Sequence, residues 1–289
     1  MARSTQRTKK KPTPRGGKGP TRSRGPMASR YDRHVLYQMA VQAPDAEIDF
    51  VDDTFKDLRG HRASTLREDF CGTAHTSCEW VRRRPSNQAW GVDLDQETLD
   101  WGRTHNIGEL KPAQQRRLHL LNDNVLTVRT PPVDIVLAMN FSYFLLTERS
   151  LLRRYFAHVR ESLKAGGVFF MDCYGGHESF KQTRDKRKIT KDVTYIWDQA
   201  DYDPISGMMT CHIHFHFSDR SKMNRAFSYH WRMWSLPEIR EILAEAGFSR
   251  STVYWEGTDP DTGEGDSDFA PRDRGDPDPA WVCYIVAEK

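Results

Sequence analysis

The 289-residue sequence lacks the glycine-rich signatures of the common phosphate-binding folds. It has no Gly-x-x-x-x-Gly-Lys-Ser/Thr segment, which argues against a P-loop phosphate site. It also lacks Gly-x-Gly-x-x-Gly, whose later glycines admit a pyrophosphate at a helix N-terminus. The missing glycines therefore argue against a nicotinamide-dependent oxidoreductase.

Cysteines are few, and long apolar runs are absent. The five cysteines are scattered and none forms a Cys-x-x-Cys pair, which favours reduced thiols over a disulfide framework or a zinc site. No uncharged apolar stretch reaches the roughly 18 residues of a membrane helix. The basic N-terminus has no apolar segment of the kind found in secretory signals. We therefore expect a cytoplasmic protein that does not enter a membrane.

Acidic residues are missing from residues 1–30, which contain ten Lys and Arg. All 40 Asp and Glu lie beyond them, together with 33 of the 43 Lys and Arg, so the rest of the chain is acidic. Residues 1–29 have no apolar pattern and are predicted to be a disordered basic tail. The tail is either a solvating extension, an arm that touches nucleic acid or another anionic surface, or a segment that folds back on the acidic residues 257–280. The acidic body argues against long nucleic acid as the main partner.

One glycine turn is informative. Residues 68–74 read Glu-Asp-Phe-Cys-Gly-Thr-Ala and join a short apolar segment to a predicted helix. Gly72 has no Cβ, so its backbone can approach a ligand closely. A second apolar strand, Trp90 onward, ends in the carboxylate of Asp93. In a doubly wound sheet such a turn and such an acid meet at one crevice, where they hold a nucleoside.

The turn resembles motif I of the class I S-adenosylmethionine-dependent methyltransferases, in its acid-x-x-Cys-Gly-Thr-Gly form. Glu68 stands at the acid position and residues 71–73 match. Ala74 replaces the last glycine, and we expect it to push the methionine part of the cofactor outward or to require a small backbone shift. Residues 91–95 are similar to the strand-two motif, with Asp93 as the ribose acid.

Three further segments follow in the order of that family. Residues 122–125 are similar to the segment after strand three, whose acid meets the adenine amino group. Residues 133–140 are similar to strand four, and residues 163–172 to the turn into strand five. The resemblance implies S-adenosyl-L-methionine as the methyl donor. It assigns cofactor contacts to Tyr37, Glu68, Cys71, Gly72, Thr73, Asp93, Leu94, Asp123, Asn124 and Asn140.

The resemblance implies an α/β fold with a Rossmann-like seven-stranded sheet and helices on both faces, over residues 30–289, with a cofactor-binding core at 63–172. Residues 192–234 alternate and are rich in β-branched and aromatic residues, which predicts three antiparallel strands after strand five. This placement is similar to the small-molecule branch of the family, where such a β cap roofs the acceptor site. Residues 257–280 are acidic and unusually long for a connection, which predicts a disordered loop or a flap beside the acceptor pocket.

Candidate catalytic residues are few, because methyl transfer mainly requires orientation of the nucleophile and exclusion of water. Asn140 and Tyr143 follow strand four, at the sheet edge where ligands bind. We expect Asn140 to contact the acceptor or the cofactor; for Tyr143, packing is an equal alternative. His212, His214 and His216 share one face of a strand. That face is either a polar cover or a pocket wall with His214 as a base; neighbours about 7 Å apart are too distant to share one metal ion.

Aromatic residues gather in the predicted cap. Tyr229 and Trp231 share one face of a predicted strand, and Trp197 lies on a different predicted strand. They either form the core of a small sheet or an aromatic box for a cationic amine. The N-terminal helix, with Arg33 and Tyr37, is a candidate lid, since such helices lie over the cofactor in the family.

The sequence thus predicts transfer of a methyl group to nitrogen or oxygen of a small-molecule acceptor. The alternative is a protein or RNA methyltransferase that recruits its substrate through the basic tail. A third hypothesis is a non-catalytic scaffold that binds the cofactor.

Overall fold

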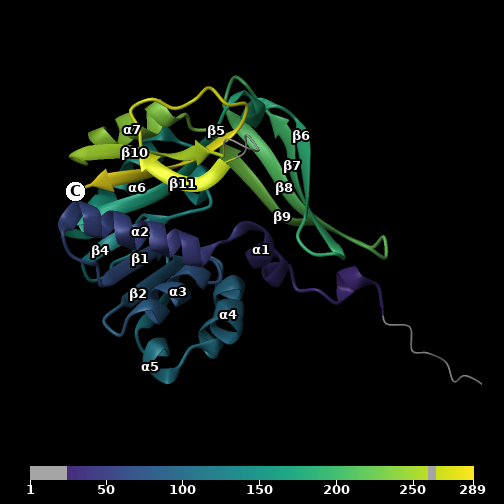
Figure 1. Ribbon diagram of the computed structural model, residues 1–289, viewed down its shortest axis with the longest axis horizontal. Helices are drawn as coiled ribbons and strands as arrows, with labels where there is room; N and C mark the ends of the chain where they lie inside the picture. The colour runs from purple at the N-terminus through teal and green to yellow at the C-terminus, as the bar shows by residue number, and fades with distance from the viewer. Residues whose placement is uncertain (1–24, 260–264) are drawn as a thin grey trace, which may run out of the picture.

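An eight-stranded sheet runs through the centre of the computed structural model, which describes residues 25–259 and 265–289 (Figure 1). Its strand order is β11-β10-β12-β5-β4-β1-β2-β3. The first five strands of the chain pair in parallel, and the order reverses between β1 and β4, the place where such sheets bind ligands. The strands are β1 (Thr65–Asp69), β2 (Gln88–Asp93), β3 (Leu118–Asn122), β4 (Val133–Ala138), β5 (Leu163–Gly175), β10 (Arg250–Thr258), β11 (Gly265–Pro271) and β12 (Trp281–Glu288).

Helices cover both faces of this sheet, because its central strands are apolar on both sides. Ile135 and Leu137 of β4 pack under α2 (Pro44–Arg59) and α3 (His75–Arg83). Val136 and Ala138 pack under α6 (Arg149–Ser162) and α7 (Leu236–Glu245). A capping box begins α7: the Ser235 side chain accepts from the Glu238 backbone N–H, and the Glu238 carboxylate accepts from the Ser235 N–H. The remaining short elements of the core are α4 (Gln96–His105), α5 (Pro112–Gln115), η2 (Ile107–Glu109), η3 (Ser142–Leu145) and η4 (His177–Phe180).

The α/β fold with helices on both faces is as predicted, but the sheet has one strand more than the expected seven. The extra strand β11 lies inside the segment 257–280 that was predicted as a loop or flap, and it pairs antiparallel with β10. Phe269 anchors it: its ring lies 4.6 Å from that of Tyr284 and 6.1 Å from that of Phe50. Residues 260–264 of that segment lie outside the described residues.

A separate four-stranded antiparallel sheet forms the cap, in the order β6 (Thr183–Lys188), β7 (Val193–Tyr202), β8 (Met208–Phe217) and β9 (Lys222–Arg232). The last three strands correspond to the predicted ones. Strand β6 was not predicted, because five of its six residues are exposed and its composition, Thr-Arg-Asp-Lys-Arg-Lys, has no apolar alternation. A charged edge strand of this kind discourages pairing with other chains.

The N-terminal helix α1 (Arg33–Val41) lies between the two sheets (Figure 1). Asp32 caps it by accepting from the backbone N–H groups of His34 and Val35. The predicted tail reached residue 29, yet the described end of it includes the short helix η1 (Met27–Ser29), whose Met27 N–H donates to Asp219 Oδ2 at 2.7 Å. Residues 1–24 lie outside the described residues.

No helix within the described ranges is both long and apolar enough to cross a membrane.

Candidate active site

The turn after β1 contains two non-glycine residues in the left-handed region. Phe70 has φ 56° and Ala74 has φ 55°. This conformation costs roughly 1–2 kcal/mol for a residue with a Cβ. Ala74 is fully buried, and it takes a conformation that glycine adopts freely. The replacement of the last motif glycine is therefore accommodated by backbone strain at Ala74.

Glu68 connects this turn to the start of α3. Its carboxylate accepts from the Ser77 backbone N–H at 2.8 Å and from the Ser77 hydroxyl. Burial raises the pKa of Glu68 to about 8, although the bonds from Ser77 oppose that shift. Glu68 thus holds the turn in place.

Asp93, at the end of β2, is bonded directly to the glycine turn. One carboxylate oxygen accepts from the Gly72 N–H at 2.7 Å, and the other accepts from the Asp95 N–H at 2.9 Å. Each oxygen has a second lone pair for a further donor. Burial raises the pKa of Asp93. The predicted turn and the predicted acid therefore meet at one point of the sheet edge.

Asn140 and Phe141, after β4, form a second strained turn, with φ of 58° and 57°. The Asp172 carboxylate, in the C-terminal part of β5, accepts from both backbone N–H groups, at 2.7 and 2.8 Å. Burial raises the pKa of Asp172 to about 7. This turn places the Asn140 amide and the Phe141 ring between the two sheets.

A cavity of about 520 Å³ lies over these two turns. Arg33, His34 and Tyr37 of α1 close it on one side, and β9 contributes Phe227 and Tyr229 from the cap. The helix is bonded to the turn, since Gln38 Nε2 donates to Thr73 Oγ1 at 2.9 Å. The predicted site residues that line the cavity are Tyr37, Glu68, Cys71, Gly72, Thr73, Asp93 and Asn140.

Three predicted cofactor residues lie next to this cavity without lining it. Leu94 is 68% exposed beside Asp93, which makes it an apolar surface at the cavity's edge. Asp123 and Asn124 follow β3, where the Asp123 N–H donates to the Asp93 carbonyl at 3.2 Å. Their contact with a cofactor stays a prediction.

Two predicted catalytic residues have structural positions instead. Tyr143 is fully buried, and its hydroxyl donates to the Asp172 carbonyl at 2.8 Å. Its predicted contact with substrate is therefore wrong, since the ring packs beneath the turn.

The His214 ring is engaged within the cap. Nε2 lies 3.1 Å from the Asp198 carboxylate, and Nδ1 accepts from the Arg225 N–H at 3.1 Å. Ile213, the preceding residue, points to the opposite face of β8 and lines a cavity there. The prediction of His214 as a base at the site is wrong, because its side chain lies on the other face of the strand.

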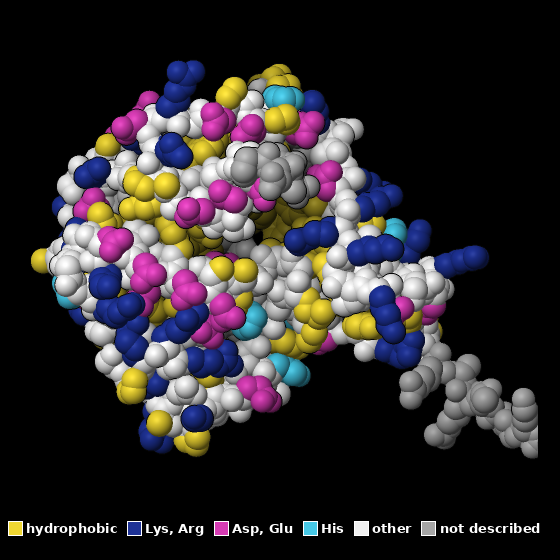
Figure 2. Space-filling model, viewed as in Figure 1, with side chains coloured by type: hydrophobic (Ala, Val, Ile, Leu, Met, Phe, Trp, Pro, Cys, Tyr) yellow, Lys and Arg dark blue, Asp and Glu magenta, His cyan; other side chains and the backbone are white. Residues whose placement is uncertain are grey.

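Two smaller cavities follow in series, the first adjoining the large cavity and the second adjoining the first. The aromatic cavity measures about 110 Å³ and shares Tyr37, Asn140 and Tyr229 with the large one. The outer cavity measures about 190 Å³ and shares Phe141 and Trp197 with the aromatic one. Figure 2 shows the face of the molecule hollowed between the core and the cap, with hydrophobic side chains inside the hollow.

Some of the residues that line these cavities were predicted from the sequence, and others were not. Trp197, Tyr229 and Trp231 were weighed as an aromatic box or as core, and they line the aromatic cavity. His34 and Phe227 were missed, although their rings lie 5.8 Å apart across the entrance. No local pattern signals a contact between residues so far apart in the chain.

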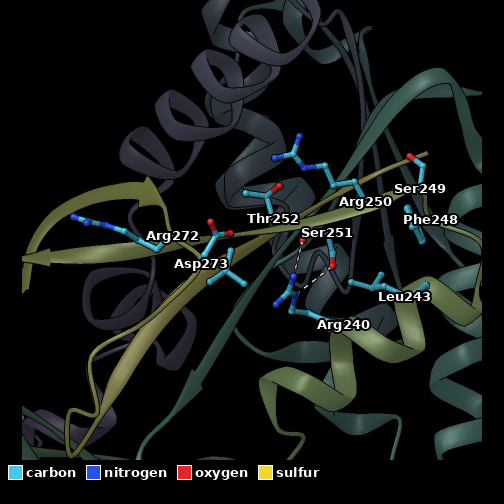
Figure 3. A pocket seen from close by; sticks show the side chains of 11 residues that line it. Arg240, Leu243, Phe248, Ser249, Arg250, Ser251, Thr252, Arg272 and Asp273 are labelled. Atoms are coloured by element: carbon cyan, nitrogen blue, oxygen red, sulfur yellow. Dashed lines mark hydrogen bonds between the residues drawn. The ribbon is translucent and has the colours of Figure 1, made fainter.

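A further hollow of about 340 Å³ lies at α7 and β10, away from these turns. It is lined by Arg240, Arg250 and Arg272. Figure 3 shows the guanidinium groups of Arg250 and Arg272 apart from each other and from that of Arg240. The three guanidinium groups therefore do not converge on one ligand.

No protein-family model and no curated protein sequence matches this chain. Solved structures do match. An S-adenosylmethionine-dependent methyltransferase from Clostridium acetobutylicum superposes with a TM-score of 0.63 at 16% identity, over 88% of this chain and 96% of that one. An amino pentose methyltransferase from Micromonospora echinaspora gives 0.62 at 18% identity, over 88% and 95%. A sugar N-methyltransferase from Streptoalloteichus gives 0.60 at 15% identity, over 90% and 93%.

These similarities establish the fold. The chain has the Rossmann-like fold of the S-adenosylmethionine-dependent methyltransferases, with a large central sheet and a separate antiparallel sheet.

Proposed function

We propose that the protein transfers a methyl group from S-adenosyl-L-methionine to nitrogen or oxygen of a small-molecule acceptor. The observation that carries the proposal is the hydrogen bond from the Gly72 N–H to the Asp93 carboxylate, at the floor of the 520 Å³ cavity. It brings a glycine turn and a strand-end acid together at the reversal of the strand order. A nucleoside with a chain attached fits that combination.

The residues of the cavity fit the parts of this cofactor. Asp93 retains lone pairs for ribose hydroxyls, and the exposed side chain of Leu94 offers an apolar surface to a purine. The backbone at Gly72 leaves room for the methionine chain. When bound, the cofactor supplies an electrophilic methyl group on a sulfonium.

The protein's own contribution is orientation and exclusion of water. Helix α1 and strand β9 close over the cavity, and Asn140 lies where it joins the aromatic cavity. The Asn140 amide can accept from an acceptor N–H or O–H and hold it against the methyl carbon. The structural neighbours support a small acceptor, because two of those compared are named for methylation of sugars.

Binding of S-adenosylhomocysteine, measured by calorimetry, tests the cofactor site. Asp93→Ala should weaken binding strongly, whereas Asp100→Ala, an exposed carboxylate on α4 that pairs with Arg103, should not change it. Equal affinity of the two variants would refute the assignment of Asp93.

Methyl transfer is tested with methyl-labelled S-adenosylmethionine and a cell extract separated into small molecules, protein and RNA. We expect label in the small-molecule fraction. Label in protein or RNA would favour the alternative, a methyltransferase that recruits its substrate through the basic tail.

A further inference from the structure

We infer that the acceptor is a small primary or secondary amine carrying a second cationic group, an inference that rests on the proposed function. Its reacting nitrogen would lie in the aromatic cavity, and its second cation in the outer cavity. The transfer would be an N-methylation.

The aromatic cavity joins the cofactor cavity directly. The two share Tyr37, Asn140 and Tyr229. Its lining consists of six aromatic side chains, two aliphatic ones and the Asn140 amide: Tyr37, Val41, Asn140, Phe141, Tyr195, Trp197, Ile213, Tyr229 and Trp231. The rings form a connected wall, with Tyr229 and Trp231 centred 4.5 Å apart and Trp197 centred 6.0 Å from Trp231.

This lining suits nitrogen better than oxygen as the nucleophile. An alcohol attacks well only when a base removes its proton, and neither an amide nor an aromatic ring takes that proton. Burial raises the pKa of the Tyr37 hydroxyl, so that phenol stays protonated. A neutral amine brings its own lone pair.

The movement of charge during methyl transfer gives the aromatic rings of the cavity a role. The amine lone pair forms the N–C bond to the methyl group while the C–S bond breaks and its electrons stay on sulfur. Sulfur becomes a neutral thioether, and nitrogen becomes a positively charged methylammonium. The charge thus moves from sulfur to nitrogen, into a cavity whose ring faces attract cations. No proton has to leave during the step.

The outer cavity suits a second cationic group on the acceptor. It adjoins the aromatic cavity at Phe141 and Trp197, and Glu178 and Asp185 are among the residues that line it. Asp185 is exposed on β6, directly opposite Trp197 in the strand pairing. Glu178 pairs with the exposed Lys181 at 3.6 Å. An acceptor that fills both cavities therefore presents its far end to Asp185, beside the Glu178–Lys181 ion pair, and the Asp185 charge favours a cation there.

The experiment compares three acceptors of equal chain length: diaminobutane, aminobutanol and butylamine. Each is incubated with methyl-labelled S-adenosylmethionine, and the product is recovered on a cation exchanger. We expect the diamine to have the lowest KM. At pH below the acceptor's pKa, kcat/KM should rise about tenfold per pH unit, because only the neutral amine attacks.

Matched variants separate the two cavities. Asp185→Asn should raise the KM of diaminobutane about five-fold, the upper range for an exposed ion pair, and leave that of butylamine unchanged. Trp231→Leu should raise the KM of both. A KM for diaminobutane that is unaffected by Asp185→Asn would overturn the placement of the second cation.

The acceptor is also checked without a chosen compound, by supplying the amine fraction of a small-molecule extract. Base-stable, cationic labelled product supports the inference. Labelled ester or neutral ether from the remaining small molecules, with no labelled amine, overturns it but leaves methyl transfer to a small molecule intact. Failure of the protein to bind S-adenosylhomocysteine would instead refute the proposed function itself.

Discussion

The Asp172 carboxylate holds the Asn140 backbone in the left-handed region, accepting its N–H at 2.7 Å while the Asn140 φ is 58°. The same carboxylate accepts from the Phe141 N–H at 2.8 Å. One buried group in the C-terminal part of β5 therefore maintains two strained residues after β4. Through them it positions both the Asn140 amide at the cofactor cavity and the Phe141 ring of the aromatic cavity.

Asp172 also makes the stability depend on pH. Its pKa is raised from 3.8 to about 7 by burial, so the folded state binds the proton more tightly than the unfolded state. Its contribution to the free energy of unfolding is therefore fully present below pH 3.8 and is lost as pH rises to about 7. Urea denaturation from pH 4 to 8 should show this loss in the wild type, at about 1.4 kcal/mol per pH unit as an upper limit.

Asp172→Asn removes that titration. At acidic pH it should be less stable than the wild type by about 1–3 kcal/mol, because the amide accepts from one N–H and leaves the other unsatisfied. The deficit should shrink as pH rises towards 7. Asp201→Asn, an exposed control in β7, should reproduce the wild-type pH profile. A constant deficit for Asp172→Asn at all pH values would contradict the assignment.

The parallel strands were predictable because each shows a buried apolar run that ends at a recognisable turn or acid. Strands β6 and β11 show the limits of strand prediction from the sequence. β6 is a charged edge strand without alternation, and β11 has a single large apolar anchor, Phe269. Neither carries the periodic signal on which strand prediction depends.

The site was predictable only where it is local in sequence. The turn at Gly72 and the acid at Asp93 could be paired from the fold rule alone. The left-handed backbone conformation of Phe70 and Asn140 could not be predicted, since residues other than glycine rarely adopt it. The position of His214 could not either: alternation groups residues on one face of a strand but does not say which face meets the cavity.

The strain at Ala74 predicts a stabilising substitution. Ala74→Gly should increase the free energy of unfolding by about 0.5–1 kcal/mol, because glycine adopts a φ of 55° without the steric penalty of a Cβ. Ala157→Gly, in the middle of α6, is the matched control and should lower stability by about 1 kcal/mol. Urea denaturation of both variants checks the sign. A loss of stability at both positions would show that Ala74 is unstrained.

Helix α4 approaches the glycine turn so closely at Gly102 that a larger residue there should disturb both stability and cofactor binding. A Cβ added at Gly102 would lie 2.5 Å from the Thr73 carbonyl oxygen, so Gly102→Ala must displace the turn or the helix. We expect a loss of roughly 1–3 kcal/mol in stability, as for other overpacked sites, together with weaker binding of S-adenosylhomocysteine. Gly108→Ala is the control, since its nearest neighbour is the Arg103 carbonyl oxygen at 3.6 Å. Calorimetric affinities that fall equally in the two variants would argue against this contact.

Removal of the Tyr143 hydroxyl should lower stability without lowering activity. Tyr143→Phe removes the donor to the Asp172 carbonyl, which should cost about 1 kcal/mol of stability. Because the ring lies beneath the turn and does not line the cavities, kcat should stay within about two-fold of the wild type, equivalent to about 0.4 kcal/mol. Asn140→Gly, which removes the amide at the junction of the cofactor and aromatic cavities without adding strain at a φ of 58°, should lower kcat markedly with no loss of stability in urea denaturation. If Tyr143→Phe instead lost activity while keeping its stability, the hydroxyl would be acting on substrate.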